Sequence, residues 1–272
     1  YGTFLLQQGR LDEALKLARQ AVEADPKGYR PYQLEATCLI RQAARLAGDA
    51  AKEKIDAAIA LLDERVNHVE HDFKGVQGYQ NKAMRTQLLL SLTELLLGRA
   101  RPEDLTVVAK YLDELEETLR GQERAESLVY LLKGRYALAE NRPVDAIKLL
   151  EQSDKLSGGN DPQVKLMLAR IYLYRNEIGA ARDAIDRALA INPTSPDILD
   201  LAAAVYLQMN DAQHAYELAE RLLGLSEGQG NRSALVRKFQ ALVRLNRLDE
   251  ASQTAAELEK IARAKEEWRR KV

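Results

Sequence analysis

Alanines recur at a nearly constant spacing in the second half of the chain. Ala146, Ala181, Ala215 and Ala251 follow one another in steps of 35, 34 and 36 residues. A period of this length is typical of helical-repeat proteins, in which each repeat is one helix pair that buries its apolar face against its neighbours. A small side chain at the repeated position lets two helix backbones approach closely. The spacing therefore predicts a stack of helix pairs.

Residues 161–193 show one such pair in full. Apolar side chains recur at helical spacing up to Tyr172, residues 176–179 interrupt the pattern, and a second apolar stripe follows from Ala181 to Leu189. Pro193 then ends the segment, as proline cannot continue a helix. The pattern predicts a helix, a tight turn and a second, antiparallel helix.

This pattern resembles the tetratricopeptide repeat. That family has small residues at positions 8, 20 and 27 of 34, large apolar or aromatic residues at positions 4, 7, 11 and 24, and proline at position 32. With Pro162 as position 1, the matching residues are Leu168, Ala169, Tyr172, Ala181, Ile185, Ala188 and Pro193. Lys165 at position 4 departs from the pattern. The resemblance implies an all-α fold, a right-handed α-solenoid of antiparallel helix pairs in the form of a tetratricopeptide-like superhelix.

The same register divides the chain into segments. We predict a single solenoid over residues 1–272, which we expect to be an excerpt of a longer protein because Tyr1 falls inside a repeat. One long helix is expected from Leu248 to the end. The predicted segments are a truncated first repeat (1–26), two degenerate helix pairs (27–121), four regular repeats (122–259) and a polar terminal helix end (260–272).

The balance of charge argues against nucleic-acid binding. Lys and Arg number 40 against 41 Asp and Glu, whereas phosphate binding needs a cationic surface excess. No membrane span is expected, because the longest apolar run, Leu88 to Leu97, contains Ser91, Thr93 and Glu94. A single cysteine, Cys38, excludes an internal disulfide framework and is expected to be buried. The sequence does not decide between the cytoplasm and the periplasm as the location of the protein.

No catalytic, metal or cofactor site is expected. His68 and His71 have the spacing of two metal ligands on one helix face, but a structural zinc site needs four ligands and no others cluster nearby, so surface residues are the favoured interpretation. The glycine-rich segment 224–231 precedes a helix as a phosphate-binding loop would. It lacks the Lys-Ser/Thr ending and a preceding strand, which favours a simple loop between repeats.

The family resemblance implies a groove along the concave face, lined by the first helix of each pair. Family positions carried onto this chain give the candidate partner-binding residues Leu131, Arg135, Leu166, Met167, Arg170, Tyr174, Asp197, Asp200, Gln208, Arg237, Gln240 and Arg244. Their charges form an arginine block (135 and 170), an aspartate block (197 and 200) and a second arginine block (237 and 244). One hypothesis is a peptide with an acidic group on the first arginine block and apolar groups on residues 131, 166 and 167. The alternative is that the leucines pack internally and the arginines pair with local acids.

These observations favour a non-catalytic scaffold that binds a protein or peptide partner, of unknown identity, in the concave groove. One alternative is the tetratricopeptide region of a larger bacterial secretion, polysaccharide-export or glycosyltransferase protein. A helical repeat that binds nucleic acid is a further alternative, although the charge balance argues against it. A second copy of the same chain is a further candidate partner.

Overall fold

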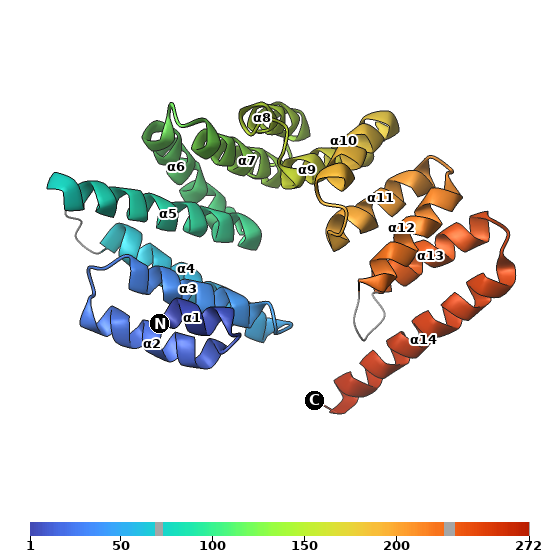
Figure 1. Cartoon of the computed structure of the whole chain (residues 1–272), viewed down its shortest axis with the longest axis horizontal. Coiled ribbons are helices and arrows are strands. Elements are labelled where there is room, and N and C mark those ends of the chain that lie inside the picture. The colour runs from blue at the N-terminus through green and yellow to red at the C-terminus, as the bar shows by residue number, and fades with distance from the viewer. Residues whose placement is uncertain (69–72, 226–231, 272) are drawn as a thin grey trace. The chain divides into compact units, whose positions relative to one another are not determined.

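The computed structural model describes residues 1–68, 73–225 and 232–271, which contain helices and no strands. This confirms the prediction of an all-α solenoid. In the coloured parts of the ribbon in Figure 1, short turns join successive helices. Within the described ranges, no helix has both the length and the apolar character needed to cross a bilayer.

The chain divides into two compact units. The N-terminal unit is Tyr1–Arg142 and the C-terminal unit is Pro143–Val272. The boundary falls in the turn inside the first of the four repeats that the sequence pattern indicates as regular. That the whole chain forms one solenoid stays a prediction.

Seven α-helices and one π-helical turn form the N-terminal unit. They are α1 (Gly2–Gln7), α2 (Leu11–Ala24), α3 (Arg30–Ala43), α4 (Asp49–Asp63), the π-helical turn Glu64–His68, α5 (Gly75–Arg99), α6 (Pro102–Leu119) and α7 (Glu123–Ala139), counted over the described part of this unit. Each α-helix contacts the next one along the chain. Contacts between sequence neighbours are the hallmark of a repeat stack.

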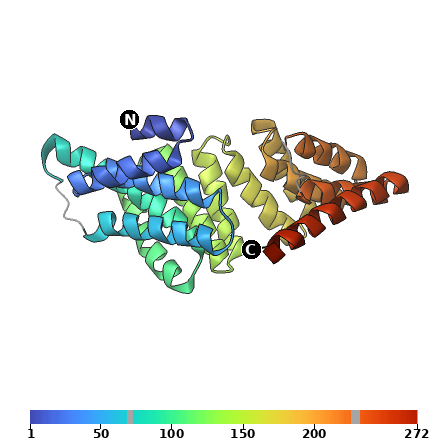
Figure 2. The ribbon, with the colours of Figure 1, turned by 90° about the horizontal axis from the view of Figure 1, so that it is seen from below.

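The C-terminal unit continues the same arrangement. Its helices are α8 (Pro143–Leu156), α9 (Pro162–Tyr174), α10 (Ile178–Ile191), α11 (Pro196–Gln208), α12 (Ala212–Gly224), α13 (Arg232–Arg244) and α14 (Leu248–Lys271). Consecutive helices are in contact, and the first helices of successive pairs, α9, α11 and α13, also contact one another in that order. Figure 2 shows α14 as one continuous helix, as the sequence predicts.

The repeated alanines lie in the packed interior. Ala146, Ala181 and Ala215 are 0% exposed and Ala251 is 3% exposed. The predicted register of small residues is confirmed at these four positions. Each leaves room at a contact between helices that a larger side chain would fill.

Lys165, which departs from the family pattern, is buried as an ion pair. Its side chain lies where the family has an apolar residue, and its Nζ donates to Oδ2 of Asp154 in α8 at 2.6 Å. A buried ammonium group is tolerated when a carboxylate compensates its charge. Asp154 in the preceding helix therefore compensates the charge that Lys165 brings to a position where the family has an apolar residue.

Asparagine occupies the turn between the two helices of each pair in the second half of the chain. Asn141, Asn176, Asn210 and Asn246 have φ of 57°, 60°, 60° and 58°. This is the left-handed region, which asparagine adopts more readily than other residues with a side chain. These asparagines repeat with the same steps as the alanines. They are a second periodic signal in the sequence, which marks the turns rather than the helix contacts.

Replacing Asn176 by alanine is expected to lower the free energy of unfolding by about 1 kcal/mol, because alanine is strained at positive φ. Replacement by glycine, which adopts this conformation freely, is expected to preserve stability. Urea unfolding followed by circular dichroism measures both variants. An equal loss in the two variants would show that the asparagine side chain, and not its backbone conformation, matters here.

Apolar side chains recur at helical spacing from Ala51 to His71, which predicts a helix several residues longer than a tetratricopeptide helix, and the structure differs within this range. After Asp63 the helix widens into the π-helical turn, and residues 69–71 lie outside the described ranges. Arg65 in this turn is buried: it stacks 3.6 Å from the ring centre of Tyr29 and donates to the carbonyls of Lys27 and Gly28. A π-helical turn shifts the residues that follow it around the helix.

Helix α5 begins at Gly75, earlier than expected. The sequence pattern predicts a connection over residues 74–78 and a helix from about Tyr79, because of the two glycines. In the structure the amide of Gly78 donates to the carbonyl of Lys74 at 2.9 Å, which closes a helical turn. Glycine costs about 1 kcal/mol in a helix but does not end it.

Candidate functional site

A pocket lies on the face that the first helices of the pairs present in the C-terminal unit. We call it the α11–α13 pocket, and its volume is about 440 Å³. Its lining residues are Leu173 from α9, Ala204, Leu207 and Gln208 from α11, and Arg237, Phe239, Gln240, Val243 and Arg244 from α13. Figure 1 labels α11 and α13, which are drawn in shades of orange, as is α12.

The helical period places the polar lining side chains. Arg237, Gln240 and Arg244 are three and four residues apart, so they lie on one face of α13. Gln208 is the last residue of α11, and Ala204 stands one turn before it. The small side chain of Ala204 leaves space between α11 and α13. Four of the candidate groove residues, 208, 237, 240 and 244, are thus brought together.

Arg237 is neutralised by an aspartate on the neighbouring helix. Its Nε and Nη2 donate to Oδ1 and Oδ2 of Asp200 at 3.2 and 3.4 Å. The aspartate block and the second arginine block therefore meet at this pair, because α11 and α13 pack side by side, as in the alternative in which arginines pair with acids of the chain. Asp197 is exposed on the first turn of α11. Arg237 is held in place by this pair and has little charge left to offer a ligand.

Arg244 keeps its charge uncompensated. Its Nη1 donates to the backbone carbonyl of Leu207 at the end of α11. That carbonyl is neutral, and no carboxylate pairs with this guanidinium within the described residues. The side chain is exposed. An exposed arginine fixed by one backbone bond can bind a carboxylate with its remaining N–H groups.

The remaining candidate groove residues are distributed differently. Leu166 on α9 is 3% exposed and belongs to the packed core, so its predicted role in partner binding is wrong. One helix position further on, Met167 is half-buried, while Arg170 and Tyr174 are exposed. Because an α-helix turns by about 100° per residue, Leu166 faces the core while the neighbouring Met167 faces partly toward solvent.

Leu131 and Arg135 lie on α7 in the N-terminal unit. Leu131 is half-buried, and Arg135 Nη1 donates to Oε1 of Glu94 at 3.3 Å. The alternative in which arginines pair with local acids therefore holds for Arg135. That Arg135 and Arg170 together bind one acidic group stays a prediction.

Five lining residues of the α11–α13 pocket are not among the twelve candidate partner-binding residues: Leu173, Ala204, Leu207, Phe239 and Val243. Phe239 stands at family position 8, where a small residue is usual, and it is half-buried. A large side chain at a position that is small elsewhere in the chain is the signal that could have drawn attention to it. Leu207 takes part through its backbone carbonyl, which no residue pattern indicates.

The other candidates from the sequence form no site in the described residues. His68 Nε2 lies 3.3 Å from Oδ2 of Asp63, and His71 and residues 226–231 lie outside the described ranges. No group of three or more metal-ligating side chains occurs in the described residues. Cys38 is buried, as predicted, and burial raises the pKa of its thiol, which keeps it protonated and unreactive.

The fold defines a class of protein, the α-helical repeat proteins, in which helix pairs stack on one another. Family models described as "Tetratricopeptide repeat" match residues 137–205 and residues 1–27. These matches confirm the resemblance to the tetratricopeptide repeat that the sequence pattern indicates, over these two segments of the chain. The first match contains the pair α9 and α10, whose residues carry the pattern seen in the sequence.

Curated relatives are much longer than this chain. Protein HemY of Escherichia coli (strain K12) is 28% identical over 131 residues, which are 48% of this chain and 31% of that protein. Cellulose synthase operon protein C of Pseudomonas fluorescens (strain SBW25) is 24% identical over 243 residues, 75% of this chain and 19% of that protein. The chain therefore spans less than a third of the length of either relative.

Among solved structures, a similar fold occurs in the chain from the crystal structure of the APC/C hetero-tetramer Cut9-Hcn1. The TM-score is 0.64 at 16% sequence identity, over 89% of this chain and 41% of that one. The type IV pilus biogenesis factor PilW gives a TM-score of 0.58 at 16% identity, over 82% of this chain and 89% of that one. At this level of identity the likeness concerns the fold alone.

Proposed function

We propose that this chain is a protein-interaction scaffold whose α11–α13 pocket binds a peptide segment of a partner protein. Tetratricopeptide repeats generally form non-catalytic scaffolds for other proteins. The observation that carries the specific proposal is the uncompensated charge of Arg244 beside the exposed amides of Gln208 and Gln240. Their side chains line one pocket.

The lining chemistry indicates what kind of peptide fits. Arg244 supplies N–H donors for a carboxylate, and a charge-assisted bond of this kind is stronger than a neutral one. Gln208 and Gln240 carry both donors and acceptors, which suit the backbone of an extended peptide. Val243 is exposed and Leu173 half-buried at the edge of the pocket, so an apolar side chain next to the acidic one gains contact there.

Peptides selected from a random displayed library on the full chain should contain an acidic residue next to an apolar one. Arg244→Glu is expected to weaken a selected, fluorescently labelled peptide about tenfold or more, because the mutation replaces an attractive charge by a repulsive one. Fluorescence anisotropy titration measures the dissociation constant. The control is Arg182→Glu, the same change at an exposed arginine on α10, a second helix of the same unit.

Two outcomes would count against the proposal. One is equal affinity of the selected peptides for the wild type and for Arg244→Glu. The other is an equal loss of affinity in Arg244→Glu and Arg182→Glu, which would indicate a general effect of net charge rather than a bond in the pocket.

A second, more specific candidate function is a scaffold within a cellulose-producing system. It is supported by the alignment with Cellulose synthase operon protein C, which extends over 75% of this chain. Deleting the coding sequence in the source organism should then reduce cellulose, and the wild-type gene should restore it. Unchanged cellulose after deletion would remove this candidate and leave the peptide-binding proposal standing.

Self-association and the absence of nucleic-acid binding stay predictions. Light scattering after size-exclusion chromatography would measure the mass of the protein in solution. A labelled single-stranded RNA at low salt would test nucleic-acid binding, because contacts with phosphates weaken steeply as salt is added.

A further inference from the structure

A second pocket lies in the N-terminal unit, where α3, α4 and α5 meet. We call it the α3–α5 pocket, and at about 760 Å³ it lies within the usual size range of ligand sites. Its lining residues are Ile40 and Ala43 from α3, Ala44 directly after that helix, Ala51, Lys52, Ile55 and Asp56 from α4, Glu94, Leu95, Gly98 and Arg99 from α5, and Arg101 directly before α6. None of them belongs to the predicted groove.

The floor of the α3–α5 pocket is apolar and open. Ile40, Ile55 and Leu95 are all half-buried, so each offers apolar surface that the fold leaves in contact with water. Gly98 adds no side chain, and a Cβ built at this glycine meets no atom within 4 Å. The space above this turn of α5 is therefore free to receive side chains of another molecule.

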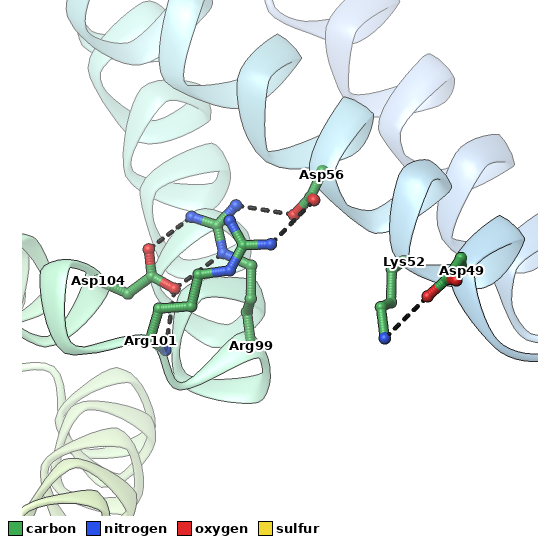
Figure 3. A network of polar contacts seen from close by, with 6 residues as sticks. All are labelled: Asp49, Lys52, Asp56, Arg99, Arg101 and Asp104. Carbon is green, nitrogen blue, oxygen red and sulfur yellow. Dashed lines mark hydrogen bonds and ion pairs between the residues drawn. The ribbon is translucent and has the colours of Figure 1, made fainter.

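The carboxylates at one edge of the pocket are already occupied. Asp56 accepts from Nη1 of Arg99 at 2.8 Å through one oxygen and from Nη2 of Arg101 at 3.1 Å through the other. Asp104 also accepts from Arg99. In Figure 3 the two guanidinium groups lie between these aspartates. Both aspartates are thus satisfied by protein groups and are not available to bind a cation.

Two cations at the same edge retain free donors. Arg101 uses Nη2 on Asp56, and no bond of its Nη1 or Nε occurs in the described part of the chain. Lys52, one helical turn before Asp56, bonds to Asp49 and leaves two N–H groups. The side chain of Arg101 is 46% exposed and that of Lys52 is 73% exposed. Arg101 and Lys52 can therefore bind a negatively charged group, while the remaining lining acid, Glu94, pairs with Arg135 at 3.3 Å.

We propose that the α3–α5 pocket is a second docking surface, which binds a helical segment of a partner protein. Two apolar side chains one turn apart on that helix fill the space above Gly98, and a carboxylate one turn further on binds Arg101 and Lys52. Helices form all the walls, and a helix packs its ridge of side chains into the groove between other helices. This surface lies in the other unit from the α11–α13 pocket, so it adds to the proposed function without depending on it.

A synthetic helical peptide tests the proposal. The probe is an alanine-rich, fluorescein-labelled helix with two leucines one turn apart and a glutamate one turn beyond the second leucine. Replacing both leucines by alanine should weaken its binding to the full chain about tenfold or more, because two buried leucines are lost. Replacing the glutamate by glutamine should weaken binding by a smaller factor than replacing the two leucines does.

Substitutions in the chain locate the peptide. Gly98→Trp fills the open space and should abolish binding, while Gly98→Ala occupies little of it and should preserve binding. Neither is expected to destabilise the fold, since alanine and tryptophan both favour a helix over glycine and a Cβ at residue 98 meets no atom within 4 Å. Lys52→Glu should weaken the glutamate peptide several-fold and leave the glutamine peptide nearly unchanged, which isolates the charge contact. Arg182→Glu, at an exposed arginine that lines neither pocket, should leave binding of both peptides unchanged.

The proposal is overturned if Gly98→Trp, shown to be folded by circular dichroism, binds the peptide as tightly as Gly98→Ala does. It is also overturned if the alanine-substituted peptide binds as well as the leucine peptide. A third contrary outcome is that a medium-chain fatty acid displaces the labelled peptide from the wild type at a lower concentration than the unlabelled peptide does. The last outcome would assign the pocket to a lipid-like anion.

Discussion

Asp104→Ala is expected to lower the free energy of unfolding of the N-terminal unit by about 3 kcal/mol. The carboxylate of Asp104 is 3% exposed and accepts two hydrogen bonds from Arg99 and one from the backbone amide of Arg101. Its removal leaves Arg99, itself largely buried, paired with Asp56 alone. Urea titration followed by circular dichroism measures the change. Glu103→Ala, at an exposed acid in the same turn, is expected to have little effect.

The same aspartate predicts a dependence of stability on pH. Hydrogen bonds from Arg99 lower the pKa of Asp104 below its ordinary value. A carboxyl group whose pKa is depressed in the folded state stabilises the fold above its unfolded pKa of about 3.9, and this contribution is lost as pH falls through the folded pKa. The difference in stability between wild type and Asp104→Ala should therefore be full near neutral pH and shrink below about pH 4. A difference that stays constant down to pH 2 would contradict the role assigned to this ion pair.

The second large effect is expected from Ala181→Leu. Ala181 on α10 is 0% exposed and fills one of the positions that repeat along the chain. Extra methylene groups in a packed interior cost about 1 to 3 kcal/mol, since neighbouring side chains must leave their preferred positions. Thermal and urea unfolding should both show the loss.

Ala190→Leu is the matched control for that experiment. Ala190 lies on the same helix and is exposed, so the same substitution should change stability little. Equal effects at residues 181 and 190 would mean that burial does not decide the outcome, and that the repeated alanines do not mark the contact between helices.

The sequence predicts the helix pairs well because their packing depends on local spacing. Ala146, Ala181, Ala215 and Ala251 all lie where the register places them, and the long final helix begins at Leu248. Each of these depends on residues within one repeat and on a period that the chain itself supplies.

Features that depend on partners far along the chain are harder to predict. Lys165 is satisfied by Asp154 from the preceding helix, and Arg237 by Asp200, which is 37 residues away. A periodic pattern places each side chain on a face but does not say which neighbours face each other. Leu166 and Met167 show the same limit, because adjacent positions on one helix have different exposure.

The candidate site was predictable in part for the same reason. The face of α13 that carries Arg237, Gln240 and Arg244 follows from helical spacing, and all three line the α11–α13 pocket. The state of each charge does not follow from spacing: Arg237 is neutralised and Arg244 is not. That difference, which only the packing of α11 against α13 reveals, directs the proposed ligand toward Arg244.

Hydrogen–deuterium exchange of the full chain, with and without a selected peptide, tests the central claim most directly. Binding in the α11–α13 pocket predicts slower exchange at the end of α11 and along α13, with α10 and α12 unchanged. Slower exchange confined to α10 and α12, or no change in α11 and α13 at saturating peptide, would contradict the account.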